Sequence, residues 1–134
     1  MKVLAMTAAA AFALASPVLA GDAAKGEKTY KKCKSCHMIV SDAGESIVKG
    51  GKTGPNLYGV IGRAAGAQEG FRYSKAIKGA ADAGLVWTEE ALAAFVQDPT
   101  GYLKEQGGDG RSKMSFKLKK GGEDVAAYLA SLTE

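Results

Sequence analysis

Residues 33–37 of this chain read Cys33-Lys34-Ser35-Cys36-His37, and they contain both of its cysteines and its only histidine. On a helical turn, positions i, i+3 and i+4 lie on the same face. The two thiols and the imidazole can therefore all point at one flat object. With three Cys and His residues in all, a zinc site with four Cys or His ligands and a scaffold of several disulfides are both excluded.

Cys-x-x-Cys-His is the attachment pattern of c-type haem, whose vinyl groups accept the thiols as thioethers while the imidazole binds the iron. The alternatives are a redox-active disulfide of the thioredoxin type and a structural i, i+3 disulfide. A thioredoxin-type motif follows a β-strand, whereas the segment before Cys33 has a helical pattern, and a structural disulfide would close too small a loop to stabilise much. The sequence therefore predicts one haem c bound covalently through Cys33 and Cys36, with His37 as an axial iron ligand.

The second axial ligand is sought among the methionines, because no other histidine exists. Met38 is adjacent to His37 and cannot reach the opposite face of a haem. Met114 lies between Lys113 and Ser115, in a stretch too polar for a core element, so we expect it to be the axial thioether ligand. A gap-filling methionine, lysine ligation, and an open iron position that would permit peroxidase chemistry are the alternatives.

The first twenty residues have the layout of a secretory signal peptide. Lys2 is followed by an apolar run from Val3 to Ala15 and by small residues up to Ala20, after which cleavage is expected. A retained membrane anchor is the alternative. The remaining residues, 21–134, suffice for one domain, and without Lys2 they carry 17 Lys and Arg against 14 Asp and Glu, a net charge of +3. This part is thin in large aliphatic residues, so a large cofactor would supply core that the chain lacks.

The predicted fold class is all-α, with three to five helices and long loops wrapped around one covalent haem. Four segments are predicted to be helical: Asp22 to about Lys34, Ser74 to Ala80, Thr88 to Asp98, and a last helix that opens after Gly121-Gly122. The last has the clearest pattern, with Val125, Tyr128, Leu129 and Leu132 at helical spacing. Residues 40–66 and 100–120 are rich in Gly and Lys and are predicted to be loops without strands.

Taken in order, the motifs of residues 21–134 resemble those of the class I cytochromes c, and in particular the larger bacterial cytochromes c2 and c550. The matching stretches are Gly21-Asp22-Ala23-Ala24-Lys25-Gly26, Cys33 to His37, Thr53-Gly54-Pro55-Asn56-Leu57-Tyr58-Gly59, Gly62-Arg63, Trp87-Thr88-Glu89-Glu90, Lys113-Met114 and Ala127-Tyr128-Leu129. The resemblance implies the cytochrome c fold and a carrier of single electrons that is not an enzyme.

The resemblance also implies roles for further residues. The carbonyl of Pro55 would accept a hydrogen bond from the second ring nitrogen of His37 and so orient it. The resemblance places three hydrogen-bond donors near the haem propionates: Arg63, Tyr73 and Trp87. The crossing of the first and last helices would involve Gly26, Tyr30, Val125 and Tyr128.

Two positions depart from the family pattern. The tyrosine usually found eight residues after Trp87, whose hydroxyl bonds the methionine sulfur, is replaced by Phe95. The loop from Tyr102 to Met114 lacks the proline that often precedes the methionine, and its Gly107-Gly108-Asp109-Gly110 stretch is expected to be mobile.

Positive charge is concentrated beside the cysteine motif and beside Met114. The basic residues in these two groups are Lys25, Lys28, Lys31, Lys32 and Lys34, and Arg111, Lys113, Lys117, Lys119 and Lys120. If both groups frame the haem edge, they form a Lys-rich face for fast, salt-sensitive docking on acidic partners; the alternative is that they only provide solubility.

The resulting hypothesis is a monomeric periplasmic carrier with no nucleic-acid partner. By resemblance, it takes electrons from a cytochrome bc1 complex and passes them to a photosynthetic reaction centre or a terminal cytochrome oxidase. The alternatives are a haem peroxidase with an open iron site and a thiol-disulfide oxidoreductase.

Overall fold

The computed structural model describes residues 21–134, so the predicted signal peptide lies outside the described residues. The elements, in chain order, are α1 (Ala23–Thr29), the 3-10 turn η1 (Tyr30–Lys32), β1 (Ile39–Val40), β2 (Ser46–Val48), α2 (Lys75–Asp82), α3 (Glu89–Gln97), α4 (Pro99–Glu105) and α5 (Gly122–Ser131). Within residues 21–134, no helix is long and apolar enough to cross a membrane. The expected all-α class with long loops is confirmed.

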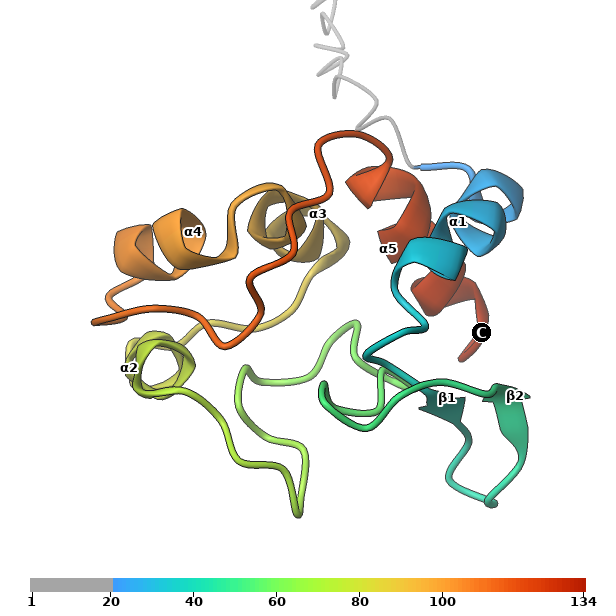
Figure 1. The fold of residues 1–134 in the computed structure, drawn as a ribbon, viewed down its shortest axis with the longest axis horizontal. Coiled ribbons are helices and arrows are strands. Elements are labelled where there is room, and N and C mark those ends of the chain that lie inside the picture. Colours follow the sequence, from blue (N-terminus) through green and yellow to red (C-terminus); the bar gives the residue numbers. More distant parts are fainter. Residues whose placement is uncertain (1–20) are drawn as a thin grey trace, which may run out of the picture.

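Helices α1 and α5, from the two ends of the described chain, pack across each other (Figure 1). Gly26 makes the crossing possible, because a Cβ atom there would lie 1.9 Å from the backbone oxygen of Asp124. Beside it, the rings of Tyr30 and Tyr128 pack with centroids 5.8 Å apart, and Val125 is buried. The expected crossing of the first and last helices through these residues is confirmed.

Capping side chains explain where α1, α2 and α3 start. Asp22 accepts hydrogen bonds from the backbone N–H groups of Ala24 and Lys25, Ser74 accepts one from Ile77, and Thr88 accepts one from Ala91. The helix predicted from Thr88 to Asp98 is confirmed, with these two residues as its N-cap and C-cap. The first helix is shorter than expected, because its α-helical part ends at Thr29 and η1 ends at Lys32.

Two parts of the predicted loops contain secondary structure. Residues 99–105 form α4, so the prediction of a loop from residue 100 was wrong over this range. Asp98 caps α4 by accepting the N–H of Gly101 at 3.2 Å, and Pro99 stands at the helix start, where its missing N–H costs nothing. The prediction that these loops contain no strands was also wrong, because β1 and β2 form an antiparallel hairpin. Strands of two and three residues are too short to show an alternating pattern.

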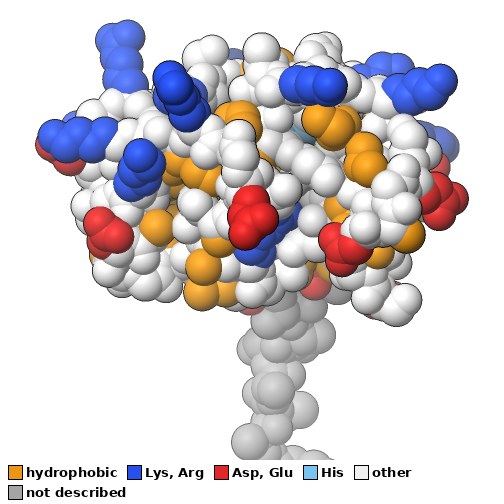
Figure 2. Space-filling view, turned by 90° about the horizontal axis from the view of Figure 1, so that it is seen from below, with side chains coloured by type: hydrophobic (Ala, Val, Ile, Leu, Met, Phe, Trp, Pro, Cys, Tyr) orange, Lys and Arg blue, Asp and Glu red, His pale blue; other side chains and the backbone are white. Residues whose placement is uncertain are grey.

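The helices do not close over one another but surround a hollow that the loops complete. Helices α3 and α5 lie side by side, α2 and α4 lie together at the other end, and residues 49–74 run beneath them (Figure 1). The space-filling view from below shows apolar side chains in hollows of this face, with Lys and Arg side chains along one edge (Figure 2). The buried apolar residues form one cluster, and part of it borders the pocket described below.

Candidate functional site

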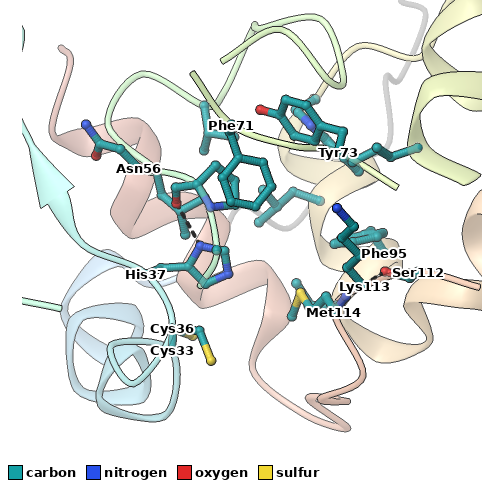
Figure 3. A pocket seen from close by; sticks show the side chains of 18 of the residues that line it. Cys33, Cys36, His37, Asn56, Phe71, Tyr73, Phe95, Ser112, Lys113 and Met114 are labelled. Atoms are coloured by element: carbon teal, nitrogen blue, oxygen red, sulfur yellow. Dashed lines mark hydrogen bonds between the residues drawn. The ribbon is translucent and has the colours of Figure 1, made fainter. Parts of the chain in front are cut away.

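All eight residues that the sequence predicts to bind or contact a haem line one pocket. They are Cys33, Cys36, His37, Pro55, Arg63, Tyr73, Trp87 and Met114. The pocket holds about 1340 Å³ of space free of protein atoms, part of it open to solvent, and most of its other lining residues are apolar. Figure 3 shows the two cysteines close together, with the His37 ring and the Met114 side chain reaching the pocket from different segments.

The cysteine motif forms a tight hydrogen-bonded turn directly after η1. The backbone N–H groups of Cys36 and His37 both donate to the carbonyl of Cys33, at 3.2 and 3.0 Å. This turn has the i, i+3 and i+4 spacing of a helix, although it lies beyond the helix end. Both thiols are free, and both line the pocket. The turn therefore presents two thiols and one imidazole to the same space.

The environment of Cys33 differs from that of a redox-active cysteine pair. Burial, followed by the proximity of Cys36, raises the pKa of the Cys33 thiol to about 11. Nucleophilic cysteines in Cys-x-x-Cys oxidoreductases have the opposite property, a lowered pKa that keeps the thiolate available. The site therefore gives no support to thiol-disulfide chemistry.

One ring nitrogen of His37 makes a hydrogen bond, and the other is free to bind a metal. Nδ1 lies 2.8 Å from the carbonyl oxygen of Pro55, which can only accept a hydrogen bond, so Nδ1 carries the proton. Nε2 of the neutral ring is then left with its lone pair. Burial lowers the pKa of His37, opposed by the bond to Pro55, so the neutral form is favoured. This is the tautomer that binds a metal through Nε2.

The glycine before Pro55 holds the imidazole in place by contact. A Cβ atom on Gly54 would lie 2.2 Å from Cε1 of His37 and 2.5 Å from Nδ1. Since side chains do not approach so closely, only glycine lets the backbone pass along the face of the ring. The Thr53–Gly59 stretch thus fixes the imidazole both by contact and by a hydrogen bond.

Two residues that support His37 were missed as functional residues by the sequence analysis. The buried hydroxyl of Tyr30 donates to the carbonyl of His37 at 3.1 Å, and burial raises the pKa of this tyrosine. The Asn56 amide accepts from the N–H of Val40 at 3.0 Å and donates to its carbonyl at 2.8 Å. These bonds tie the loop that carries Pro55 to β1. Their partners are backbone groups distant in sequence, which no local pattern reveals.

Met114 reaches the pocket from the segment between α4 and α5. Its side chain is partly buried and packs against the hydrophobic core. Its backbone N–H donates to the hydroxyl of Ser112 at 3.1 Å (Figure 3). A thioether is therefore available in the same pocket as the His37 imidazole.

The three residues expected near propionates also border the pocket, and two of them share one polar network. The Arg63 guanidinium donates to the side-chain oxygen of Gln68 and to the carbonyl of Tyr58, and burial lowers its pKa. The Tyr73 hydroxyl accepts the N–H of Gln68 at 3.0 Å. Trp87 is buried beside Phe95, with ring centroids 4.9 Å apart, so packing is part of its role.

The donor set fits a haem better than a bare metal ion. Nowhere in residues 21–134 do three His, Cys, Asp or Glu side chains cluster closely enough to hold a metal. An iron in this pocket must therefore bring its own equatorial ligands, leaving the protein to supply axial donors. A large apolar pocket with two adjacent thiols, one imidazole nitrogen and one thioether meets that requirement.

The two basic groups of the sequence analysis are on the surface. All ten side chains are exposed, and of these ten only Lys117 forms an ion pair with a described residue, Asp98, at 3.7 Å. Lys113 also donates from Nζ to the backbone carbonyl of Arg72 at 2.7 Å. Most of these basic side chains therefore have no acidic partner among residues 21–134.

Comparisons with known proteins give a consistent result along nearly the whole chain. It is 55% identical to cytochrome c2 of Rhodobacter capsulatus, over 98% of both chains. It is 49% identical to cytochrome c-550 of Paracoccus versutus, over 97% of this chain and 88% of the relative. The solved structure of the Rhodobacter capsulatus cytochrome c2 superimposes with a TM-score of 0.82 at 54% identity, covering 85% of this chain and all of that one. No protein-family profile matches the chain.

Proposed function

The chain belongs to the class I c-type cytochromes, a family of electron carriers rather than enzymes, and on that premise we propose that it shuttles single electrons between membrane redox complexes of the periplasm. The observation that carries the proposal is the pocket that brings both thiols, the His37 imidazole and the Met114 thioether together.

In this proposal, Cys33 and Cys36 would hold a haem c through thioether bonds, and His37 Nε2 and Met114 would bind its iron. The haem supplies a ferrous–ferric couple when bound. The hydrogen bond from Nδ1 to Pro55 orients His37 and makes the imidazole a stronger donor. The soft thioether of Met114 favours ferrous iron, which raises the reduction potential. With both axial positions filled, the chain would leave no open site for peroxide, which argues against the peroxidase alternative.

The other residues of the pocket would control the surroundings of the haem. Apolar side chains from α3 and α5, among them Leu92 and Leu129, would keep water from the haem face. Arg63, Tyr73 and Trp87 would bind the propionates and compensate their charge. Since none of these residues has to move for an electron to pass, the reorganisation that accompanies each transfer would be small.

The proposed partners follow from the family and from the surface charge. The donor would be a complex of the cytochrome bc1 type, and the acceptor would be a photosynthetic reaction centre or a terminal oxidase. Residues 1–20 would act as a cleavable signal peptide that directs residues 21–134, a soluble monomeric domain, to the periplasm. The Lys-rich face beside Cys36 and Met114 would dock on acidic surfaces of both partners.

Haem attachment is tested by extraction. Protein made together with haem-maturation enzymes is expected to be red and to keep its colour in acidic acetone, because thioether bonds survive denaturation. In Cys33→Ala and Cys36→Ala variants the remaining single bond still retains haem, whereas the double variant releases all of it. The measurement is the absorbance of the acetone phase. Release of the pigment from the unaltered protein would contradict covalent attachment.

Docking through the Lys-rich face predicts a strong dependence on ionic strength. The second-order rate of electron transfer with an isolated cytochrome bc1 complex is expected to fall by about tenfold or more between low and physiological salt, because screening removes the electrostatic attraction. Stopped-flow absorbance measures the rate. An uncharged small reductant serves as the control, since its rate should stay flat. A flat response with the complex as well would rule out electrostatic docking.

A further inference from the structure

The segment that carries Met114 has no hydrogen bonds between backbone groups. Within the described chain, no backbone group of residues 109–117 donates to or accepts from another backbone group. The nearest such bonds are those of Gly108 to Leu103 and of Leu118 to Val96, both 2.7 Å long. Gly107 and Gly110 have φ angles of +92° and +90°, a conformation that glycine adopts readily. The backbone at Met114 must therefore be fixed by side chains.

Two hydroxyl groups provide this restraint in series. The Thr100 hydroxyl accepts the backbone N–H of Ser112 at 3.1 Å, and the Ser112 hydroxyl accepts the backbone N–H of Met114, also at 3.1 Å. Both bonds are partly buried, so water competes with them less than at the open surface. Thr100 stands in the first turn of α4, which Asp98 caps and the fully buried Leu103 anchors. The series therefore links Met114 to a fixed helix.

Other restraints on this methionine are weaker or missing. Phe95 has no hydroxyl that could bond the sulfur, and no proline stiffens the loop before it. The remaining contact nearby, from Lys113 Nζ to the carbonyl of Arg72, is exposed to solvent. A surface bond by a long lysine side chain contributes little, because it must order that side chain.

We propose that Thr100 and Ser112 are positioning residues for Met114, holding its backbone so that the thioether stays in reach of the iron. The proposal rests on the proposed function, in which Met114 is an axial ligand. Restricting the segment before ligation lowers the entropy that iron binding has to overcome. Loss of either hydroxyl should therefore weaken Met114 as a ligand while leaving the rest of the fold in place.

The test measures how easily an external ligand displaces Met114. Oxidised protein is titrated with imidazole, and the loss of the far-red charge-transfer band of His/Met haem gives the apparent affinity. Thr100→Val and Ser112→Ala each remove one hydroxyl at nearly constant size. Each is expected to raise the imidazole affinity by roughly fivefold, the factor that corresponds to one hydrogen bond. Ser112→Thr and Thr100→Ser keep the hydroxyl and should restore the original affinity.

A matched control separates positioning from general stability. The Ser41 hydroxyl accepts the backbone N–H of Glu45 at 3.1 Å in the β1–β2 hairpin, outside the pocket lining. Ser41→Ala thus loses a bond between a hydroxyl and a backbone N–H, although an exposed one, and should leave the imidazole affinity unchanged, while denaturant unfolding reports the stability of all variants. If Thr100→Val and Ser112→Ala bind imidazole no better than Ser41→Ala, the positioning role is refuted, but Met114 remains the proposed iron ligand. If the unaltered protein lacks the charge-transfer band, the ligation itself is refuted.

Discussion

Replacement of Met114 by alanine is expected to abolish the far-red charge-transfer band of the oxidised protein and to lower its reduction potential. The band arises from a thioether bound to ferric haem, and an alanine leaves that position to water or to another side chain. Because the thioether favours ferrous iron, its loss should lower the potential by on the order of 100 mV or more. Absorption spectra and a redox titration of the purified protein measure both effects.

The chain provides a matched control for this substitution. Met38 is the only other methionine in residues 21–134; it is partly buried and adjacent to His37, but it does not line the pocket. Met38→Ala should therefore keep the band and change the potential little. A band that persists in Met114→Ala would show that another residue is the ligand. Increased peroxidase activity in Met114→Ala alone would agree with an axial position that the methionine normally blocks.

Gly54→Ala is expected to disrupt the iron ligand on the other side of the pocket. The added Cβ would lie 2.2 Å from Cε1 of His37, so either the ring or the backbone of the Thr53–Gly59 stretch must move. Either movement weakens the 2.8 Å bond from Nδ1 to Pro55. Overpacking and loss of a partly buried hydrogen bond together should lower the free energy of unfolding by roughly 2–5 kcal/mol. Denaturant unfolding followed at the haem absorbance measures this loss.

Gly79→Ala is a suitable control, because Gly79 lies in α2 and its added Cβ would approach the backbone of Gly107 and Gly108 no closer than 3.2 Å, a tight contact that a small shift of that loop relieves. The helix gains from alanine, so the net change should stay within about 1 kcal/mol. If Gly54→Ala unfolds at the same denaturant concentration as Gly79→Ala, the contact between Gly54 and the imidazole does not hold His37. A lowered yield of red protein from Gly54→Ala would agree with the expected effect.

Features with a local sequence signal were predicted with good accuracy. The start at Thr88 and the apolar stripe of the last helix depend on residues a few positions apart, and the structure confirms those helices. Helix α4 was missed because its seven residues include Pro99 and Gly101 and bury only Pro99 and Leu103. The β1–β2 hairpin was missed because its strands are too short for a period to show.

The sequence by itself determined the chemistry of this protein. One imidazole, two thiols at the spacing of a haem attachment motif and one distant methionine limit which donors a cofactor can find, whatever the fold. Only the tertiary structure decided how these donors are held: the tautomer of His37 through Pro55, the close approach of Gly54, and the link from Met114 through Ser112 to Thr100. These contacts join residues up to 18 positions apart through backbone atoms, which every residue type carries, so the side-chain pattern of this chain alone does not reveal them, and the bond to Pro55 was expected only from the resemblance to the class I cytochromes c.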